Sequence, residues 1–494
     1  MKVIIITLTI FILAFTSCNS WLDVTPQDTV EEDVLFSTGD GYRNVLNGVY
    51  KQMATPSLYG KELSWGTLDI IGQLYHQRAF GSGTTYRRVS EYKYEDKAVK
   101  PLIQEIWSLA YNSIANCNSI LSKIDDTDST LFRSSNNEKM LIKGEALALR
   151  AFLHFDMLRL FAPAPNPQDQ KTYIPYFKTY PSTFEADRPV KEILELAIKD
   201  LEAARNLVAP HDTIAWRIML RTDYRIFFEG SNSSLNQDLF FQSRGFRMNY
   251  LAICALLARV YNYMGEFDAN YYQKSYDIAE HVIKFVLKPE SSSEKNLFFT
   301  PYYYAEENKK LYHGVIFCLS NQKLLEDYQS LTSDSNHPFY LKAASQMFDD
   351  NADIRQTDLT RARGSYLVCT KNIPPDGQPG QFSACKDMLP MIRLSELYYI
   401  QAEYLCRKGD IPGAIEKIDV VREARNCQTG ILGQMYQKIK NFDSFKTEMV
   451  KEAARDFMQE GQVFFYYKRF KLFPKTGMTE TNMVLPKPDN ELIN

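Results

Sequence analysis

Two segments of this chain carry the same arrangement of small, apolar and helix-ending residues. The segment Leu-Ala-Arg-Val-Tyr at 257–261 leads to Gly265, and the segment Gln-Ala-Glu-Tyr-Leu at 401–405 leads to Gly409. In both, an Ala stands seven residues before the Gly, and a further helical stretch follows. Small residues let paired helices approach closely, and Gly can adopt the left-handed conformation at the turn between them. This is the pattern of a tetratricopeptide-like helix pair.

Helical periodicity extends over much of the remaining chain, with apolar residues mostly three or four positions apart. The stretch 139–161 is rich in Ala and Leu, is followed by Pro163 and Pro165, and forms another candidate pair with 190–207. The spacing between these units is too irregular for a simple solenoid, so we predict a helical scaffold with large insertions. The predicted helices span 105–124, 139–161, 190–207, 249–264, 271–287, 392–408, 411–425 and 442–458.

Long irregular segments separate the helical units. The segment 65–94 is rich in Gly, Ser, Thr and aromatic residues, and the mixed segments 210–245 and 287–390 include strand-like runs such as 314–318. Segments of this length inside a compact domain are usually functional. We therefore expect one mainly α-helical domain over 18–494, with a loop-rich lobe beside the helices. The scaffold is assigned to 40–60, 100–208, 247–288 and 390–460, and the lobe to 62–98, 209–246 and 288–390.

The first residues predict an exported, lipid-anchored chain. Lys2 is followed by an apolar run over 3–15, which is too short to span a bilayer and has the length of a signal-peptide core. The run ends in Phe-Thr-Ser-Cys at 15–18, which resembles a bacterial lipobox. On this interpretation residues 1–17 are removed as a signal peptide, and Cys18 carries the acyl chains that anchor the protein. An ordinary secretory signal with a Cys near its cleavage site is the alternative.

Composition and motif content argue against several classes of protein. The formal net charge is −3 and no basic run is present, so nucleic-acid binding is not expected. The sequence has no phosphate-binding Gly loop, no Gly-x-Ser-x-Gly or His-Glu-x-x-His motif, and no Cys/His cluster at zinc spacing. We therefore expect neither an enzyme nor a metal or other cofactor. Cys369 and Cys385 flank a Pro/Gly-rich loop and could form a disulfide across it.

Three polar features are assigned structural roles, two of them in preference to a functional one. His154 lies on an apolar helix, and we favour a core histidine over a catalytic base. The aspartates within 349–353 precede Arg355 but lack the ligand spacing of a calcium loop, so surface charge or an Asp–Arg pair is favoured over a calcium site or a catalytic carboxylate pair. Glu460 is expected to make a helix-end or core contact.

Five motifs follow one another along nearly the whole chain. They are Trp-Leu-Asp-Val-Thr-Pro at 21–26 after Cys18, Ala-Leu-Arg-Ala-Phe at 148–152 with Arg-Leu-Phe-Ala-Pro at 159–163, Ala-Leu-Leu-Ala-Arg-Val-Tyr at 255–261, Arg-Leu-Ser-Glu-Leu-Tyr at 393–398 with Ala-Glu at 402–403, and Glu-Gly-Gln at 460–462 with Lys-Arg-Phe at 468–470 and Leu-Pro at 485–486. Together they resemble the SusD/RagB family of surface lipoproteins from Bacteroidetes nutrient-uptake systems. Asp456, Val463 and Tyr466 stand where the family usually has Glu, Arg and Asp. Those positions look structural in the family, so the departures concern packing more than function.

The resemblance implies a fold of about four tetratricopeptide-like helix pairs plus a loop-rich lobe that contains short strands and the ligand site. It also implies a lipid-anchored protein of the outer membrane that faces the cell exterior and passes its ligand to a partner TonB-dependent (SusC-like) transporter barrel. A glycan is the expected ligand. Capture of a peptide is the alternative within the family, and a tetratricopeptide scaffold for a protein partner is the alternative outside it.

The expected ligand site combines aromatic rings, which stack on sugars, with polar groups for the hydroxyls. One group of candidates lies in the lobe segment that often approaches the ligand site in this family, and another lies in a Tyr triplet. Successive residues of an extended segment face opposite sides, so a triplet is hard to bury completely. Packing in the core or in a loop is the alternative for each of them. The candidates are Trp65, Tyr75, Tyr86, Arg87, Tyr302, Tyr303 and Tyr304, with Trp216, Tyr224, Phe227 and Phe228 of the 210–245 insertion as further aromatic residues.

Overall fold

The computed structural model describes residues 32–215, 217–220, 225–226, 238–287, 308–332, 339–373 and 385–491. Several predictions lie outside these residues: the signal peptide and Cys18, the triplet Tyr302, Tyr303 and Tyr304, and Trp216, Tyr224, Phe227 and Phe228. Within the described ranges, every helix is too short or too polar to cross a lipid bilayer.

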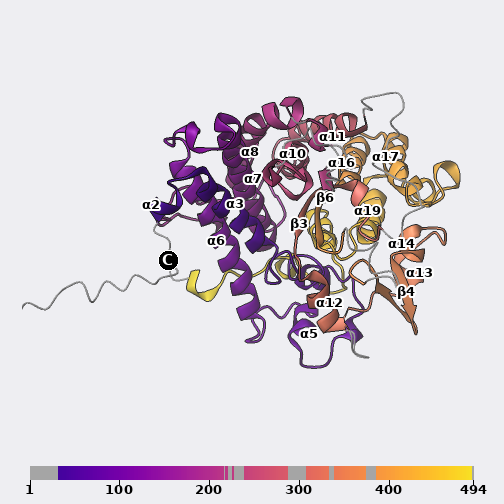
Figure 1. Cartoon of the computed structure of the whole chain (residues 1–494). Helices are drawn as coiled ribbons and strands as arrows, with labels where there is room; N and C mark the ends of the chain where they lie inside the picture. The colour runs from indigo at the N-terminus through magenta and orange to yellow at the C-terminus, as the bar shows by residue number, and fades with distance from the viewer. Residues whose placement is uncertain are drawn as a thin grey trace, which may run out of the picture.

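Eight of the described helices form a row in which each packs against the next of the eight (Figure 1). The row consists of four successive helix pairs. This arrangement confirms the predicted scaffold, including the pair formed by 139–161 and 190–207. The helices are α3 (Gly39–Met53) and α6 (Lys100–Lys123), α7 (Ser135–Phe161) and α8 (Val190–Ala209), α10 (Tyr250–Met264) and α11 (Asn270–Leu287), and α16 (Leu394–Arg407) and α17 (Ile411–Glu423).

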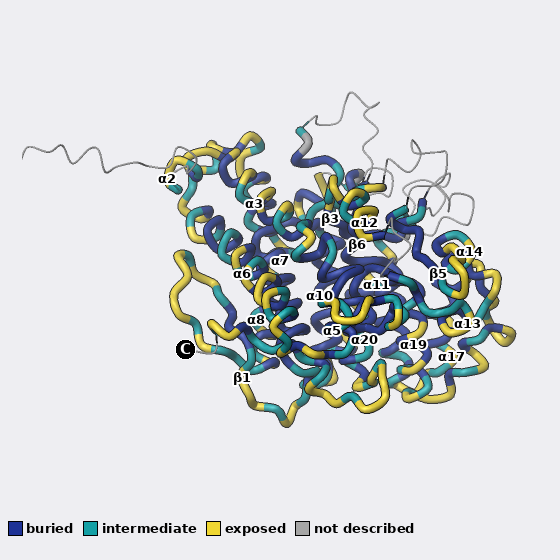
Figure 2. Tube along the Cα trace, turned by 90° about the horizontal axis from the view of Figure 1, so that it is seen from below, coloured by how far each residue is buried: buried dark blue, intermediate teal, exposed yellow. Residues whose placement is uncertain are grey.

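Helices α7 and α10 are the buried centre of this row (Figure 2). Every residue of α7 from Gly144 to Phe161 is buried, and so is every residue of α10 from Leu251 to Met264. A helix that is buried on all sides needs neighbours on all sides, and α3, α6, α8 and α10 all pack against α7. A Cβ atom on Gly144 would lie 2.6 Å from Cγ1 of Val208 in α8. The close packing of α7 on α8 therefore requires a residue without a side chain at position 144.

The two Gly residues of the repeated pattern have different structural roles. Gly409 has φ of +85°, the left-handed conformation that the pattern predicts after α16. Gly265, after α10, has φ of −58°, so the left-handed prediction is wrong at this turn. A Cβ atom on Gly265 would instead lie 2.5 Å from Cδ1 of Tyr272 in α11. Gly265 is required because an aromatic ring packs on its backbone.

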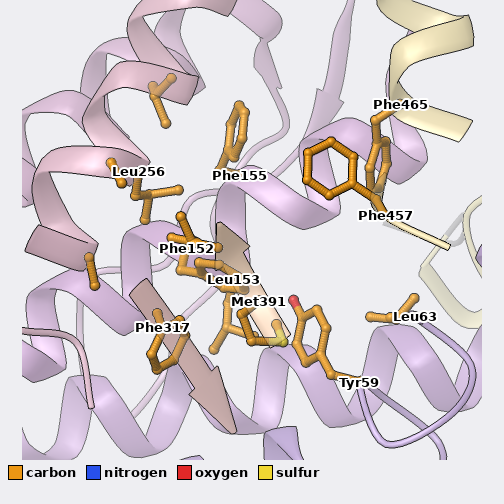
Figure 3. Packing of buried hydrophobic residues seen from close by; sticks show 14 of the residues in the cluster. Tyr59, Leu63, Phe152, Leu153, Phe155, Leu256, Phe317, Met391, Phe457 and Phe465 are labelled. Carbon is orange, nitrogen blue, oxygen red and sulfur yellow. The ribbon is translucent and has the colours of Figure 1, made fainter. Parts of the chain in front are cut away.

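A two-stranded antiparallel sheet packs against helices α3 and α10 of the row. It pairs β3 (Val315–Ser320) with β6 (Met388–Arg393), which confirms the strand-like run at 314–318. The predicted helix 392–408 begins later than expected, because its first two residues belong to β6. The sheet faces the helical core: the ring of Phe317 in β3 meets the ring of Phe152 in α7 edge-on, with centroids 6.2 Å apart (Figure 3).

Shorter elements form the loop-rich lobe, which occupies the lower part of the molecule in Figure 1. They come from segments far apart in the sequence. They include the β4–β5 sheet, which is one of three two-stranded sheets within the described residues. The elements of the lobe are α4 (Thr67–Ile71), α5 (Thr85–Ser90), α12 (Leu324–Thr332), α13 (Ala344–Met347), α14 (Ile354–Thr357), β4 (Thr360–Arg363) and β5 (Tyr366–Cys369). The remaining α-helices and strands of the described chain are α2 (Glu32–Leu35), β1 (Thr172–Ile174), β2 (Arg188–Pro189), α18 (Gln434–Lys438), α19 (Phe442–Asp456) and α20 (Val463–Arg469).

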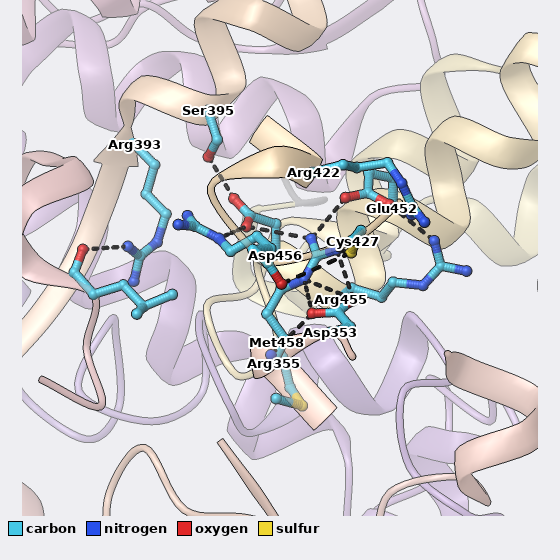
Figure 4. Close-up of polar contacts among 12 residues, drawn as sticks. Asp353, Arg355, Arg393, Ser395, Arg422, Cys427, Glu452, Arg455, Asp456 and Met458 are labelled. Atoms are coloured by element: carbon cyan, nitrogen blue, oxygen red, sulfur yellow. Dashed lines mark hydrogen bonds and ion pairs between the residues drawn. The ribbon is translucent and has the colours of Figure 1, made fainter. Parts of the chain in front are cut away.

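A buried network of charges joins the lobe to the end of the helical row (Figure 4). Arg355 of α14 lies 2.8 Å from a carboxylate oxygen of Asp353 and 2.6 Å from one of Glu452 in α19. Glu452 also lies 2.8 Å from both Arg422 and Arg455. Burial opposes ionisation, but these three guanidinium groups hold the pKa of Glu452 well below its ordinary value. The network confirms the predicted Asp–Arg pair.

Glu460 makes the predicted core contact. Its buried carboxylate lies 2.6 Å from Arg393 and 2.7 Å from Lys371. The nearby side chain of Asp69 is fully buried. Burial and then the negative charge of Glu460 raise the pKa of Asp69 well above its ordinary value, and the backbone N–H groups of residues 459 and 461 offset this only in part.

Replacing Asp69 by Asn is therefore expected to stabilise the fold at neutral pH. The stability that Asp69 contributes is fully present below its unfolded-state pKa of 3.8 and is lost as the pH rises towards its higher folded-state pKa. Asn stays neutral, so the advantage of D69N in free energy of unfolding should grow as the pH rises from about 4 to neutral. Urea unfolding at several pH values measures this advantage. A difference between the two chains that does not change with pH would contradict it.

Candidate ligand-binding site

Two of the predicted site residues, Trp65 and Tyr75, lie in the core of the lobe. The ring of Trp65 is fully buried, its Nε1 donates a hydrogen bond of 2.9 Å to the carbonyl of Gly60, and it meets the rings of Tyr328 and Phe339 edge-on. Tyr75 is 2% exposed, and its hydroxyl donates to the carbonyl of Trp65 at 2.6 Å. Neither ring offers a face to a ligand in this structure. Burial assigns both to packing, which corrects the expectation of direct ligand contact.

The chain around Tyr75 runs beside two other extended segments of the lobe. Tyr75 forms an antiparallel bridge with Leu341, and Leu341 forms another with Leu367 of β5. The backbone N–H of His76 donates to the carbonyl of Tyr340 at 2.7 Å, and that of Leu341 donates to Leu367 at 2.9 Å. Because β4 pairs with β5, four extended segments lie next to one another, in the order β4, β5, 341 and 75.

Side chains alternate between the two sides of these segments, as they do in any extended chain. Tyr75, Leu341 and Leu367 are buried and point to the core. His76, Tyr340 and Tyr366, each next to one of them in the sequence, are only half-buried. The predicted residue Tyr75 therefore faces the core, and its neighbour His76 lies on the more accessible side of the segment.

His76, Tyr340 and Tyr366 form a group of rings that we call the aromatic face. The ring of Tyr366 lies 4.8 Å from that of His76 and stacks on that of Tyr340 at 5.3 Å, with an interplanar angle of 22°. Neighbouring rings with accessible area provide the flat apolar surface on which a sugar or another ring can stack. No sequence pattern singled out these three residues. The available signal was the alternation of apolar and aromatic residues in Phe-Tyr-Leu at 339–341 and Tyr-Leu-Val at 366–368.

A cavity of about 500 Å3 is lined by residues of the β4–β5 sheet, among them Arg363, the cross-strand partner of Tyr366. The register of the β4–β5 sheet sets Arg363 opposite Tyr366 and Arg361 opposite Val368, so these four side chains share one side of the sheet. Both arginines are exposed. The lining combines cationic, polar and apolar groups, as ligand sites do. It is formed by Gln329, Thr332, Arg361, Ala362, Arg363, Val368 and Ile373.

Tyr86 and Arg87, the other predicted site residues in the described chain, lie on α5. The half-buried Tyr86 packs edge-on against Phe339, with ring centroids 5.7 Å apart, and its hydroxyl donates to Oε1 of Glu62 at 2.9 Å. Burial and then the charge of Glu62 raise the pKa of Tyr86 well above its ordinary value. Arg87 pairs with Glu91 at 2.7 Å. Tyr86 thus borders the aromatic core of the lobe, and a ligand role for either residue stays a prediction.

A second cavity, of about 400 Å3, lies between α6, β1 and the last described residues. Its charged side chains are already paired with one another: Lys100 lies 3.0 Å from Asp489, and Lys487 lies 2.6 Å from Asp187. These pairs join the end of the chain to the helical scaffold. The first cavity, next to accessible rings, is therefore the stronger candidate for ligand binding.

The polar residues considered for catalysis or cross-linking have structural roles. His154 is fully buried, with Nδ1 donating to the carbonyl of Arg150 at 2.9 Å and Nε2 accepting from the N–H of Phe177 at 3.0 Å. Burial lowers the pKa of His154 to about 3, which confirms the neutral core histidine. Cys369 and Cys385 are buried and the disulfide considered between them is not formed. Across the described ranges, no group of three or more His, Cys, Asp or Glu residues is placed to hold a metal ion.

Family profiles match most of the chain in two parts. A SusD-like profile described as starch-binding and associating with the outer membrane matches residues 20–217. A SusD/RagB profile described as the SusD family matches residues 255–485. Among characterised proteins, SusD-like protein P2 of Formosa agariphila is 25% identical over 207 residues. This match covers 42% of the chain and 38% of that relative, so it spans about two fifths of the relative's length.

Solved structures share the fold over almost the full length. A SusD superfamily protein from Bacteroides thetaiotaomicron is 21% identical, with a TM-score of 0.66, and the match covers 92% of this chain and 97% of that one. A SusD-like carbohydrate-binding protein from Bacteroides vulgatus is 18% identical, with a TM-score of 0.62 over 88% of this chain and 84% of that one. Four helix pairs, a lobe with short strands, and two profile matches that follow each other along the sequence lead to one conclusion: the chain belongs to the SusD/RagB family.

Proposed function

We propose that this protein is a nutrient-binding lipoprotein of the outer membrane. It captures an oligo- or polysaccharide at the aromatic face and the adjacent cavity, and it passes the ligand to a partner TonB-dependent transporter. Binding uses ring stacking and hydrogen bonds and makes or breaks no covalent bond, so the protein is not an enzyme. Cys18 carries the lipid anchor, and the protein faces the cell exterior.

The observation that carries this proposal is the group of rings formed by His76, Tyr340 and Tyr366 next to a cavity that offers both apolar and hydrogen-bonding side chains. Sugar rings present C–H surfaces that stack on aromatic faces, while their hydroxyls need donors and acceptors at the rim. Thr332 and Gln329 supply such groups in the cavity lining. The carbohydrate-binding relative from Bacteroides vulgatus and the outer-membrane description of the matching profile agree with this interpretation. The lipobox-like sequence before Cys18 supports the anchor.

Binding of the whole chain, purified in a mild detergent, to a panel of polysaccharides and peptide mixtures tests the proposal. Affinity electrophoresis would identify the ligand, and calorimetry would measure its Kd. Tyr366→Ala removes the ring that contacts both others, so we expect it to weaken glycan binding about tenfold, which is about 1.4 kcal/mol. Because Tyr366 is half-buried at the surface, its removal should leave the melting temperature nearly unchanged.

Tyr436→Ala is the matched control, because Tyr436 is an exposed aromatic residue, 44% accessible, on a different element, α18. Its affinity should equal that of the unchanged chain. Glycan binding that both variants retain in full would overturn the assignment of the site. Binding of peptides alone would replace the glycan by a peptide, the alternative within the family. Co-purification of a TonB-dependent barrel from detergent extracts of the native membrane would test the transporter partner.

A further inference from the structure

Two cations near the aromatic face have no acidic partner among the described residues. Arg363 is exposed on β4, and Lys342 is half-buried just before α13. Neither takes part in the ion pairs of the described chain, whereas Arg87 on the neighbouring α5 is paired with Glu91. Burial alone lowers the pKa of Lys342, with no charged neighbour contributing. Burying an ammonium group without a counter-charge costs free energy, which a bound anion would recover.

Both cations are on the same side of the extended segments as the aromatic rings. Arg363 is the direct cross-strand partner of Tyr366. Lys342 is two residues from Tyr340 in an extended segment, so the two side chains point the same way. None of the described residues that line the cavity beside Arg363 is an Asp or Glu. This side of the lobe therefore combines stacking surface with positive charge.

This combination matches a sugar that carries an acidic group. A guanidinium group binds a carboxylate or sulfate through two parallel hydrogen bonds, and an ammonium group adds a second charge without fixed geometry. A neutral glycan would need only the rings and the hydrogen-bonding groups at the rim. It would leave Arg363 and Lys342 without a partner.

We propose that the ligand is an acidic glycan, with a sugar ring on Tyr366 and its carboxylate or sulfate groups bound by Arg363 and Lys342. The inference rests on the proposed function and narrows its substrate class. Carboxylated and sulfated sugars share the required chemistry. The protein distinguishes both from neutral polysaccharides because only the charged sugars satisfy the two cations.

Calorimetry of the whole chain with three probes tests the inference: polygalacturonate, a sulfated galactan and a neutral glucan. We expect saturable binding of at least one acidic probe and at least tenfold weaker binding of the glucan. Arg363→Gln and Lys342→Gln should each weaken acidic binding about tenfold, and raising NaCl from 50 to 500 mM should weaken it further. Lys475→Gln is the matched control, because Lys475 is an exposed lysine outside the lobe and should lose nothing.

The outcomes separate this inference from the function on which it rests. Binding of the neutral glucan that Tyr366→Ala weakens and Arg363→Gln does not would overturn the acidic ligand and keep the glycan-binding function. Equal losses of affinity in Arg363→Gln and Lys475→Gln would mean that the chain attracts any polyanion. That result would also overturn the inference of a specific acidic ligand. Failure to bind any polysaccharide of the panel would overturn the function and the inference together.

Discussion

Replacing Glu452 by Ala is expected to lower the free energy of unfolding by about 3–5 kcal/mol. Glu452 is fully buried and lies within 2.8 Å of Arg355, Arg422 and Arg455, which are themselves at most 2% exposed. Removing the carboxylate leaves three guanidinium groups inside the protein with one fewer counter-charge. The cost comes mainly from leaving these buried cations with too little compensating negative charge, and less from the lost attraction.

Two controls make this result interpretable. Glu416→Ala removes an exposed carboxylate from α17 and should change stability by less than about 0.5 kcal/mol. Glu452→Gln keeps the shape but loses the charge, so it should fall between the two. Urea unfolding followed by circular dichroism measures all three. A loss below about 1 kcal/mol in E452A would mean that water or rearranged carboxylates reach the arginines.

The same network predicts the direction of acid sensitivity. The pKa of Glu452 is held well below its ordinary 4.5, and that of Asp456 is lowered from 3.8 to about 2. A lowered folded-state pKa gives stability that is present above the unfolded-state pKa and is lost as the pH falls through the folded-state pKa. The unchanged chain should therefore lose stability between about pH 4.5 and pH 2, and E452A should lose less over that interval.

Replacing Trp65 by Ala is expected to cost about 3–5 kcal/mol in free energy of unfolding, as for other large aromatic residues in cores. Its ring is fully buried against Tyr328 and Phe339, with centroids 5.0 and 5.2 Å away, and its N–H is satisfied by Gly60. The lobe cannot refill that volume without moving α12. We expect the thermal unfolding midpoint to fall by several degrees.

Tyr366→Ala is the matched comparison for Trp65→Ala, because both aromatic residues lie in the lobe but Trp65 is fully buried and Tyr366 only half-buried. Trp65→Ala should lose stability and, well below its melting temperature, retain most of its ligand affinity. Tyr366→Ala should lose affinity and retain stability. A Trp65→Ala chain that melts like the unchanged protein but binds more weakly would contradict the packing role and restore Trp65 as a ligand contact.

The helical scaffold could be predicted from the sequence because its signals are local. Apolar spacing marks each helix within one stretch of chain, and the small residue at Ala258 or Ala402 marks a close approach to the next helix. The predicted left-handed conformation was wrong at one of the two turns, because a turn can require Gly either for a positive φ or for space. Gly265 and Gly409 look alike in the sequence, yet only Gly409 has a positive φ, while Gly265 makes room for a ring.

The candidate site could not be predicted to the residue because its geometry depends on pairing between distant segments. Single bridges join Tyr75 to Leu341 and Leu341 to Leu367, and each segment is too short to reveal its alternation by itself. Tyr75 and His76 are adjacent, and only the bridge decides which of them faces the core. Burial of Trp65 follows in the same way from residues far along the chain, Tyr328 and Phe339.

The assembly of the aromatic face from three distant segments has a kinetic consequence. Helix pairs bring together neighbouring parts of the chain and can form early, whereas loops that must close over most of the sequence form late. His76 meets Tyr340 and Tyr366 only when the loop of more than 260 residues between positions 76 and 340 has closed. Ligand binding therefore requires complete folding. Partly folded or truncated chains that already contain ordered helices would not bind the ligand. A binding assay thus reports on correct folding of the whole chain.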